Sequence, residues 1–435
     1  MARRIGIGTQ DFEKVRMNDH FYIDKTKLIQ EWWESGDEVT LITRPRRFGK
    51  TLNMSMLEKF YSVQYANRSD LFEGLFIWRE KSPDGETLPY GDKYRKLQGT
   101  YPVLFISFAG IKENHFAGAR ENICRTIEEQ YNKHDYLCES GLLNDKEKDF
   151  YQRVTAQMPD GVAAVSLRSL SDFLGRYYGK KVIILLDEYD TPMQEAFING
   201  YWDEMTAFIR SLFNSTFKTN PYLERALMTG ITRISKESVF SDLNNLEVVT
   251  TTSKKYTDCF GFTEEEVFSV LKEYDMADRE RQVKDWYDGF CFGKRRDIYN
   301  PWSVINFLDK GKVGAYWANT SSNGLGDKLI REGNPEVKKN FERLIQGEEI
   351  WMEIDEQIIY DQLFTKKNAV WSLLLASGYL KVKDYRSHMT EYGVWKEEYE
   401  LSLTNLETRI MFMNMVRGGG GLTRYPPSIM NSSGR

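Results

Sequence analysis

The sequence has few cysteines and no long apolar run. Its four cysteines are scattered over 435 residues and form no C-x-x-C pair, which indicates a reducing compartment rather than a disulfide scaffold. No stretch approaches the roughly 20 consecutive apolar residues that a membrane-spanning helix needs. The start, Met-Ala-Arg-Arg-Ile-Gly, has no apolar segment behind it of the kind found in secretory signals. We therefore expect a cytoplasmic protein that does not bind membranes.

The chain also lacks a strong charge of one sign. Its formal net charge is −5, so no overall positive field would draw it to nucleic acid, although a local basic face could still do so. Apolar residues make up 41% and charged residues 28%, which is typical of a soluble globular protein. A chain of 435 residues is long enough for two or three domains.

The most informative segment that is present runs from Thr43 to Thr51 and reads Thr-Arg-Pro-Arg-Arg-Phe-Gly-Lys-Thr. It follows a mostly apolar run, residues 39–42, and precedes an amphipathic stretch, which predicts a strand, a tight loop and a helix that starts at Gly-Lys-Thr. A helix N-terminus offers free N–H groups to a phosphate. Lys50 would reach the outer phosphates, and Thr51 would place its hydroxyl on Mg²⁺.

The loop departs from the full P-loop pattern, G-x-x-x-x-G-K-[ST], at its first position. Arg44 stands where the first glycine is expected, and Pro45 pushes it toward extended geometry. We expect three arginines to add positive charge where phosphate would lie: Arg44, Arg46 and Arg47. The predicted nucleotide-binding residues are Arg46, Arg47, Phe48, Gly49, Lys50, Thr51 and, from a later strand, Thr229. Because Gly-Lys-Ser/Thr is a short pattern, a plain basic turn is the alternative.

A second signal is a pair of acids after an apolar run. Residues 182–186 are bounded by Lys181 and by Asp187-Glu188, which predicts a strand buried on both faces. Open α/β sheets bind ligands just outside the carboxyl ends of their strands. There Asp187 would hold Mg²⁺ opposite Thr51, and Glu188 would orient and deprotonate the attacking water. The alternative is a buried strand followed by an acidic turn.

Three further strands are predicted over residues 101–108, 224–233 and 246–252. Thr229 could sense the γ-phosphate, and Arg233 could stabilise charge in the transition state as an arginine finger does; a surface arginine is the alternative. Five candidate strands with helical stretches between most of them predict an α/β fold with a parallel sheet flanked by helices.

Seven separated motifs resemble those of the bacterial AAA-ATPase-like family, in the family's order and from about residue 5 to about residue 417. They are Tyr-Ile-Asp-Lys-Thr (22–26), Arg-Pro-Arg-Arg-Phe-Gly-Lys-Thr (44–51), Leu-Asp-Glu-Tyr-Asp (186–190), Thr-Gly-Ile-Thr-Arg (229–233), Trp-Tyr-Asp-Gly-Phe (286–290), Tyr-Asn-Pro-Trp-Ser-Val (299–304) and Trp-Ala-Asn-Thr-Ser-Ser-Asn (317–323). In that family the loop normally begins with Arg rather than Gly. The resemblance implies a P-loop ATPase of the additional-strand, catalytic-glutamate type, with ATP and Mg²⁺ as its cofactors. It also implies that a PD-(D/E)xK-like nuclease domain usually follows, so that the chain would be the motor or switch part of a nuclease-linked system.

We expect four parts along the chain: a lead segment (1–30), the P-loop ATPase core (31–255), a helical lid and winged-helix-like region (256–417), and a disordered or aberrant tail (418–435). The β pattern stops near residue 256, and helices should dominate from there to about 345. Thr263 should cap one of them, and Asn300-Pro301-Trp302 should open another by placing Pro in its first turn. The winged-helix-like unit, around residues 369–382, could bind DNA or pack against the core, and the lack of a clear basic recognition helix favours packing. Relatives continue toward the nuclease domain where the Gly-rich tail begins, so the tail resembles a truncation.

Two other patterns predict no further chemistry. Glu336-Val337-Lys338 matches the E-x-K triplet of such nucleases, but Pro335 before it and apolar residues at helical spacing predict a helix start, so we expect no nuclease activity. His115, Cys124, His134 and Cys138 lie in one region, but structural zinc sites usually carry tighter ligand pairs.

Two functions remain open. The first is an enzyme that hydrolyses ATP with Mg²⁺, in which Lys50, Glu188 and Arg233 act on the reaction and Thr51 and Asp187 hold the metal. The second is a slow or non-hydrolysing nucleotide-gated switch or scaffold whose helical region binds DNA or a protein partner. The chain could form a homo-oligomer, and Arg233 could act either within its own subunit or across a subunit boundary.

Overall fold

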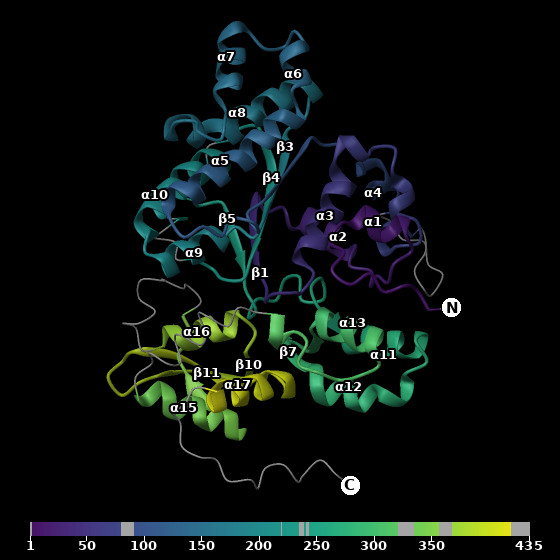
Figure 1. Ribbon diagram of the computed structural model, residues 1–435, viewed down its shortest axis with the longest axis vertical. Helices are drawn as coiled ribbons and strands as arrows, with labels where there is room; N and C mark the ends of the chain where they lie inside the picture. Colours follow the sequence, from purple (N-terminus) through teal and green to yellow (C-terminus); the bar gives the residue numbers. More distant parts are fainter. Residues whose placement is uncertain are drawn as a thin grey trace.

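The computed structural model describes residues 2–79, 91–218, 220–234, 239–240, 243–320, 335–355 and 368–418. Its first half holds a five-stranded parallel sheet in the order β2-β3-β4-β1-β5 (Figure 1). The strands are β1 (Val39–Thr43), β2 (Val103–Ser107), β3 (Val182–Asp187), β4 (Leu223–Gly230) and β5 (Leu246–Val249). This confirms the predicted parallel sheet. Because β4 lies between β1 and β3, the sheet also has the additional strand that the resemblance implied.

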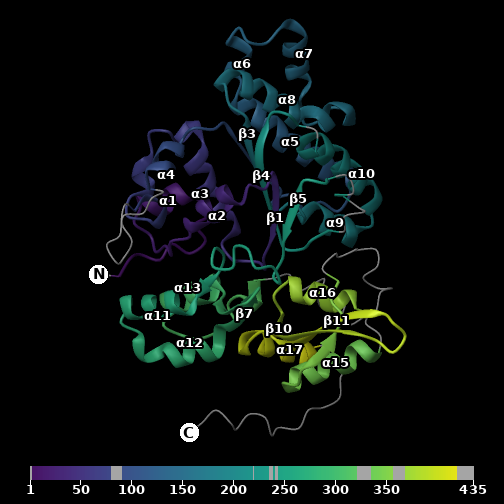
Figure 2. The same ribbon diagram turned by 180° about the vertical axis from the view of Figure 1, so that it is seen from behind.

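Helices cover both faces of the sheet (Figures 1 and 2). Alternate residues of a strand point to opposite faces, so Ile184 and Leu186 of β3 belong to one buried cluster, and Ile183 and Leu185 belong to another. The first cluster includes side chains of α5 (Phe116–Lys133), α6 (Tyr136–Glu139), α7 (Asp145–Arg153), α8 (Asp160–Tyr178), α9 (Thr191–Asn199) and α10 (Trp202–Phe213). The second includes side chains of α1 (Phe12–Met17), α2 (Lys27–Ser35), α3 (Lys50–Tyr61) and α4 (Gly91–Leu97).

Short helical turns connect these elements: η1 (Val63–Tyr65), η2 (Ser69–Phe72), η3 (Phe76–Trp78), η4 (Asn214–Lys218), η5 (Ala277–Arg279) and η6 (Ala318–Thr320). Within the described ranges, none of the helices combines the length and the apolar character that crossing a bilayer requires.

The predicted lead segment packs against both halves of the chain. Phe12 and Val15 of α1 lie in the cluster beneath α3. Phe21 and Ile23 lie in a third cluster, which is built mainly by the region after residue 256. The lead segment therefore forms part of two buried cores, and residues on it can reach the edge of the sheet where the two halves meet.

The expectation that the β pattern stops near residue 256 is wrong. Two small antiparallel sheets follow, one in the order β6-β8-β7 and one in the order β10-β11-β9. Their strands are β6 (Phe262–Thr263), β7 (Asp288–Phe292), β8 (Arg295–Tyr299), β9 (Ile350–Met352), β10 (Leu380–Met389) and β11 (Trp395–Leu403). These strands are short or largely polar, as in the Arg-Arg-Asp-Ile-Tyr of β8, so they lack the apolar run that marks a buried strand.

Helices still form most of this second half: α11 (Glu264–Glu273), α12 (Glu280–Tyr287), α13 (Pro301–Lys310), α15 (Pro335–Gln346), α16 (Ala369–Ala376) and α17 (Leu406–Gly418). The predicted N-cap at Thr263 and the predicted helix start at Pro301 are confirmed. Thr263 forms a capping box with Glu266 at the start of α11, and the Asn300 side chain accepts a hydrogen bond from the Ser303 N–H at the start of α13.

Before α17, the described elements follow the order α15, β9, α16 and then the hairpin β10–β11, in which β11 also pairs with β9. A winged-helix-like unit would need a helix, strand and hairpin in this order, although the domain limits themselves stay a prediction. Glu336 and Lys338 lie in the first turn of α15, as predicted from Pro335. The predicted tail lies outside the described residues from Gly419 onward.

Candidate nucleotide site

A cavity of about 460 Å³ lies at the carboxyl edge of the parallel sheet. The loop between β1 and α3 supplies much of its wall: Arg46, Arg47, Phe48, Gly49, Lys50 and Thr51. Other parts of the wall come from the lead segment, from Glu188 and the start of α9, and from Trp302 on α13. Cavities of roughly 300–1,000 Å³ are typical of small-ligand sites. The site is therefore built where the lead segment, the sheet and the second half meet.

Lys50 is the first residue of α3 and follows Gly49, whose φ of 81° is left-handed. Its Nζ donates hydrogen bonds to the Arg44 carbonyl at 3.0 Å and to the Pro45 carbonyl at 2.7 Å. Burial lowers the pKa of Lys50, and the negative charges of Glu188, Asp187 and Asp190 oppose this effect. The loop therefore folds around the ammonium group and keeps it at the N-terminus of the helix.

Thr51 lines the cavity and contacts Asp187, which is fully buried and is not among the described lining residues. The Thr51 hydroxyl donates a hydrogen bond to Asp187 Oδ2 at 2.7 Å, and the Thr229 hydroxyl donates one to Asp187 Oδ1 at 2.5 Å. Burial raises the pKa of Asp187, while the two hydroxyl donors lower it. Thr229 is fully buried behind the carboxylate. It therefore orients Asp187 and is not among the described residues that line the cavity, where the sequence placed it with the nucleotide-binding set.

Glu188 lines the cavity and has a left-handed backbone, with φ of 52°. This backbone conformation is energetically unfavourable for a glutamate, so contacts with the surrounding structure must stabilise it. Its Oε2 accepts a hydrogen bond from the Thr191 hydroxyl at 3.1 Å, and the rest of the side chain is only half-buried. Asp187 is thus turned into the protein and Glu188 toward the cavity, although the two are neighbours in sequence.

Arg44 does not add charge to the phosphate position, and this expectation is wrong. The side chain is fully buried, and its guanidinium donates to the carbonyls of Thr43 and Thr250 at 2.9 Å each, and to those of Lys255 and Tyr256 at 3.3 and 3.4 Å. It also lies over the rings of Phe260 and Phe292. Burial lowers the pKa of Arg44 to about 10, so the group stays charged at neutral pH. Through these hydrogen bonds, Arg44 connects the end of β1 to the segment that follows β5.

The other side chains of the loop tip contact the second half of the chain. Phe48 is buried against Phe290 and Phe292, at ring distances of 4.7 and 5.5 Å. Arg47, with φ of 63°, stacks on Trp302 at 4.5 Å. The Arg46 carbonyl accepts a hydrogen bond from Trp317 Nε1 at 3.0 Å. Of the predicted binding residues here, Phe48 can offer only its backbone, while the exposed Arg46 and Arg47 border the cavity.

Arg233 lies in the short loop after β4, three residues beyond the end of the strand. Its neighbour Ile231 lines the cavity, but Arg233 is not among the described lining residues. Its side chain is half-buried and forms no hydrogen bond or ion pair within the part of the chain that the structure describes. The structure thus brings Arg233 near the site and not into it.

Sequence reasoning missed the contribution of the lead segment, which adds Gly8, Thr9, His20 and Phe21 to the cavity wall. These residues carry no local signal of ligand binding, and only the Tyr-Ile-Asp-Lys-Thr motif beside them marks the segment. Within that motif, Lys25 is buried and its Nζ bonds Glu266 Oε2 at 2.7 Å and the Asp258 carbonyl at 2.9 Å.

Four residues whose side chains can bind zinc lie in one region of the sequence: His115, Cys124, His134 and Cys138. His134 Nδ1 lies 3.0 Å from the Tyr136 hydroxyl, and none of the four residues belongs to a metal-compatible group within the described ranges. The group that does occur there consists of Glu264, Asp288 and Asp297, and the Lys284 ammonium already pairs with Glu264.

The fold is that of a P-loop nucleoside triphosphatase. Three features define it: a parallel sheet with β4 between β1 and β3, a Gly-Lys-Thr loop after β1, and an aspartate at the end of β3. A family model described as "AAA-ATPase_like: Predicted AAA-ATPase" matches residues 6–240. The chain belongs to this family, as the motifs indicated. It is also similar to a protein of Azotobacter chroococcum mcd 1 described as "Uncharacterized protein in vnfD 5'region", with 27% identity over 323 residues, which are 74% of this chain and 54% of that protein. The chain thus spans about half the length of this relative.

Proposed function

We propose that this chain binds ATP with Mg²⁺ and hydrolyses it. The observation that carries the proposal is the 2.7 Å hydrogen bond between the Thr51 hydroxyl and Asp187 Oδ2, one residue from the Lys50 ammonium at a helix N-terminus. Such an arrangement combines a phosphate-binding helix end with oxygen ligands for a hard cation. Membership of a family of predicted AAA-ATPases supports the same activity.

The residues present fit a magnesium ion. Thr51 and Asp187 offer hydroxyl and carboxylate oxygens, which are the donors that Mg²⁺ prefers, and Thr229 holds the carboxylate from behind. When bound, Mg²⁺ would neutralise negative charge on the phosphates. Lys50 would bind the outer phosphates, for which its ammonium must exchange hydrogen bonds with the Arg44 and Pro45 carbonyls for bonds to phosphate oxygens.

Glu188 is the proposed general base. It lines the cavity next to the metal-holding Asp187, and its carboxylate is only partly occupied by the Thr191 hydroxyl. A carboxylate in this position can orient a water molecule and take its proton. Arg233 would act on the transition state, in the same subunit after a rearrangement or across a subunit boundary.

The test measures ATP affinity and phosphate release on the same samples. Lys50→Ala should abolish binding or turnover because the phosphates lose a fixed positive charge. Glu188→Gln should keep ATP bound and slow release by about a hundredfold or more, whereas Asp187→Asn should weaken Mg²⁺-dependent binding. Lys59→Ala is the matched control, because Lys59 is also buried on α3 but does not line the cavity. Parental turnover in Lys50→Ala, or equal affinity losses in both acidic variants, would contradict the assignment.

The alternative is a nucleotide-gated switch that binds ATP and releases little or no phosphate. This alternative is favoured by the two hydrogen bonds that the Lys50 ammonium donates to carbonyls of its own loop, since these bonds must break before the ammonium can bind a nucleotide. ATP binding without phosphate release in the wild type would select this function. The link to a nuclease system, and a DNA or protein partner for the second half, belong to the same proposal.

A further inference from the structure

Asp190, two residues after the proposed base, binds the loop that follows β4. Its Oδ2 accepts hydrogen bonds from the backbone N–H of Ile231 at 3.0 Å, from the N–H of Thr232 at 2.8 Å and from the Thr232 hydroxyl at 2.8 Å. Gln194 adds a fourth donor at 2.9 Å. Asp190 stands at the N-cap of α9, but its side chain does not cap that helix as an aspartate there ordinarily does. The carboxylate is committed to the neighbouring strand's loop instead.

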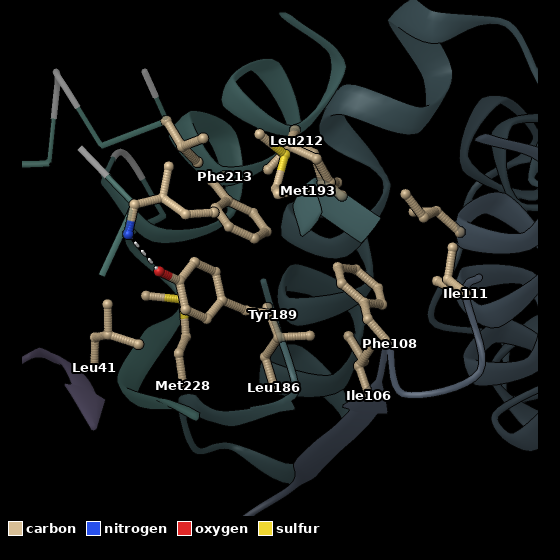
Figure 3. Close-up of a cluster of buried hydrophobic side chains, with 14 of the residues drawn as sticks. Leu41, Ile106, Phe108, Ile111, Leu186, Tyr189, Met193, Leu212, Phe213 and Met228 are labelled. Carbon is tan, nitrogen blue, oxygen red and sulfur yellow. Dashed lines mark hydrogen bonds between the residues drawn. The ribbon is translucent and has the colours of Figure 1, made fainter. Parts of the chain in front are cut away.

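Tyr189 binds the same loop from a second point. Its hydroxyl donates to the Thr232 carbonyl at 2.8 Å and accepts from the Ile234 N–H at 3.0 Å. The ring is fully buried and lies among apolar side chains, several of which are labelled in Figure 3: Leu186, Met193, Phe213 and Met228. A Cβ on Gly230 would come within 2.7 Å of both this ring and Asp190 Oδ1, so the end of β4 approaches the pair as closely as a glycine permits.

These contacts connect two residues that the proposed reaction uses. Glu188 precedes the pair and has a left-handed backbone, which persists only where the neighbouring structure over-determines it. Arg233 lies inside the bound loop, between Thr232 and Ile234. The N–H and carbonyl of Thr232 and the N–H of Ile234 are hydrogen-bonded by the side chains of Tyr189 and Asp190, which follow β3. Neither Tyr189 nor Asp190 is among the described residues that line the cavity, so neither is placed to touch a nucleotide.

We propose that Tyr189 and Asp190 are positioning residues for hydrolysis, which hold Glu188 and the loop that carries Arg233 in one rigid arrangement. The inference rests on the proposed ATPase function. A rigid clamp of this kind would act on the transition state more than on ground-state binding, because the residues proposed to bind the nucleotide, Lys50 and Thr51, lie on a different element, α3.

Asp190→Ala should therefore lower kcat by about tenfold or more while it changes the Kd for ATP by less than about threefold. Asp190→Asn should recover most of the lost rate, because the amide oxygen can accept the same N–H groups. Tyr189→Phe keeps the ring in its apolar pocket and removes only the hydroxyl, so it should lower kcat by less than Asp190→Ala. If Asp190→Ala fails to fold, Tyr189→Phe still tests the inference through its own loss of kcat. Tyr131→Phe is the matched control, since that buried hydroxyl bonds a carbonyl on α8, away from the cavity, and the variant should keep the parental rate.

A double variant separates positioning from a general loss of structure. If Asp190 acts partly through Arg233, the losses of Asp190→Ala and Arg233→Ala should combine to less than their product. Three results would overturn this inference: equal losses of kcat and ATP affinity in Asp190→Ala, fully multiplicative losses in the double variant, or a failure of Asp190→Asn to restore the rate. Any of these, together with normal turnover by the wild type, would leave the proposed function intact. A wild type that binds ATP and never hydrolyses it would overturn both.

Discussion

Replacing Arg44 by glycine would restore the full P-loop pattern, yet the structure predicts that this change lowers the free energy of unfolding. The Arg44 guanidinium donates to four backbone carbonyls, two of them at 2.9 Å, and lies fully buried between two aromatic rings. In Arg44→Gly those carbonyls lose their donors, the side chain leaves a void, and the backbone gains freedom in the unfolded state.

The size of the effect follows from the two short bonds. A hydrogen bond to a charged group is worth about 1.5–3 kcal/mol, so the loss of both should lower the free energy of unfolding by about 3–6 kcal/mol. The cost of burying a charge without a carboxylate partner offsets part of this, which favours the lower end of the range. For a domain of this size we expect the Tm to fall by about 10 °C.

Thermal unfolding followed by circular dichroism, together with ATP affinity, tests the prediction. Arg46→Gly is the matched control, because Arg46 is exposed in the same loop and should change the Tm little. Arg44→Lys should lie between the wild type and Arg44→Gly, since one ammonium cannot reach all four carbonyls. An Arg44→Gly protein that is as stable as the wild type and binds ATP as tightly would refute the role given to Arg44.

Two further predictions concern residues in the second half of the chain. Burial raises the pKa of Glu407 to about 7, against 4.5 for an ordinary glutamate, so the folded protein binds a proton that the unfolded chain has released between these pH values. Stability should therefore fall as pH rises from about 4.5 to about 7, by up to about 3 kcal/mol, and Glu407→Gln should flatten this part of a Tm-versus-pH profile; identical profiles would contradict it. Gly261→Ala should lower the Tm more than Gly36→Ala, because both have left-handed φ (78° and 71°) but only at Gly261 would a Cβ come within 2.7 Å of a neighbouring side chain. Equal Tm losses would show that the backbone conformation alone decides.

Much of the first half could be predicted because its signals are local. The apolar run before Asp187 can only be a buried strand, and Gly-Lys-Thr after a strand indicates a helix start at a phosphate site. Thr263 caps its helix and Pro301 opens the next one as predicted, because both signals depend on a few consecutive residues. The strands of the second half were missed, since short polar antiparallel strands derive their stability from partners distant in sequence.

The sequence by itself determined the strand–loop–helix unit that places Lys50 and Thr51 at a helix start, because residue type and spacing along one continuous segment decide that local structure. Only the tertiary structure decided what the neighbouring polar residues do. Arg44, next to the loop, turns inward to carbonyls more than 200 positions away, and Thr229 holds Asp187 rather than lining the cavity. Asp190 leaves its own helix uncapped to bind the loop after β4. A buried polar side chain must form hydrogen bonds with the groups that the fold places next to it. These groups are often distant in sequence, so local sequence patterns do not predict them.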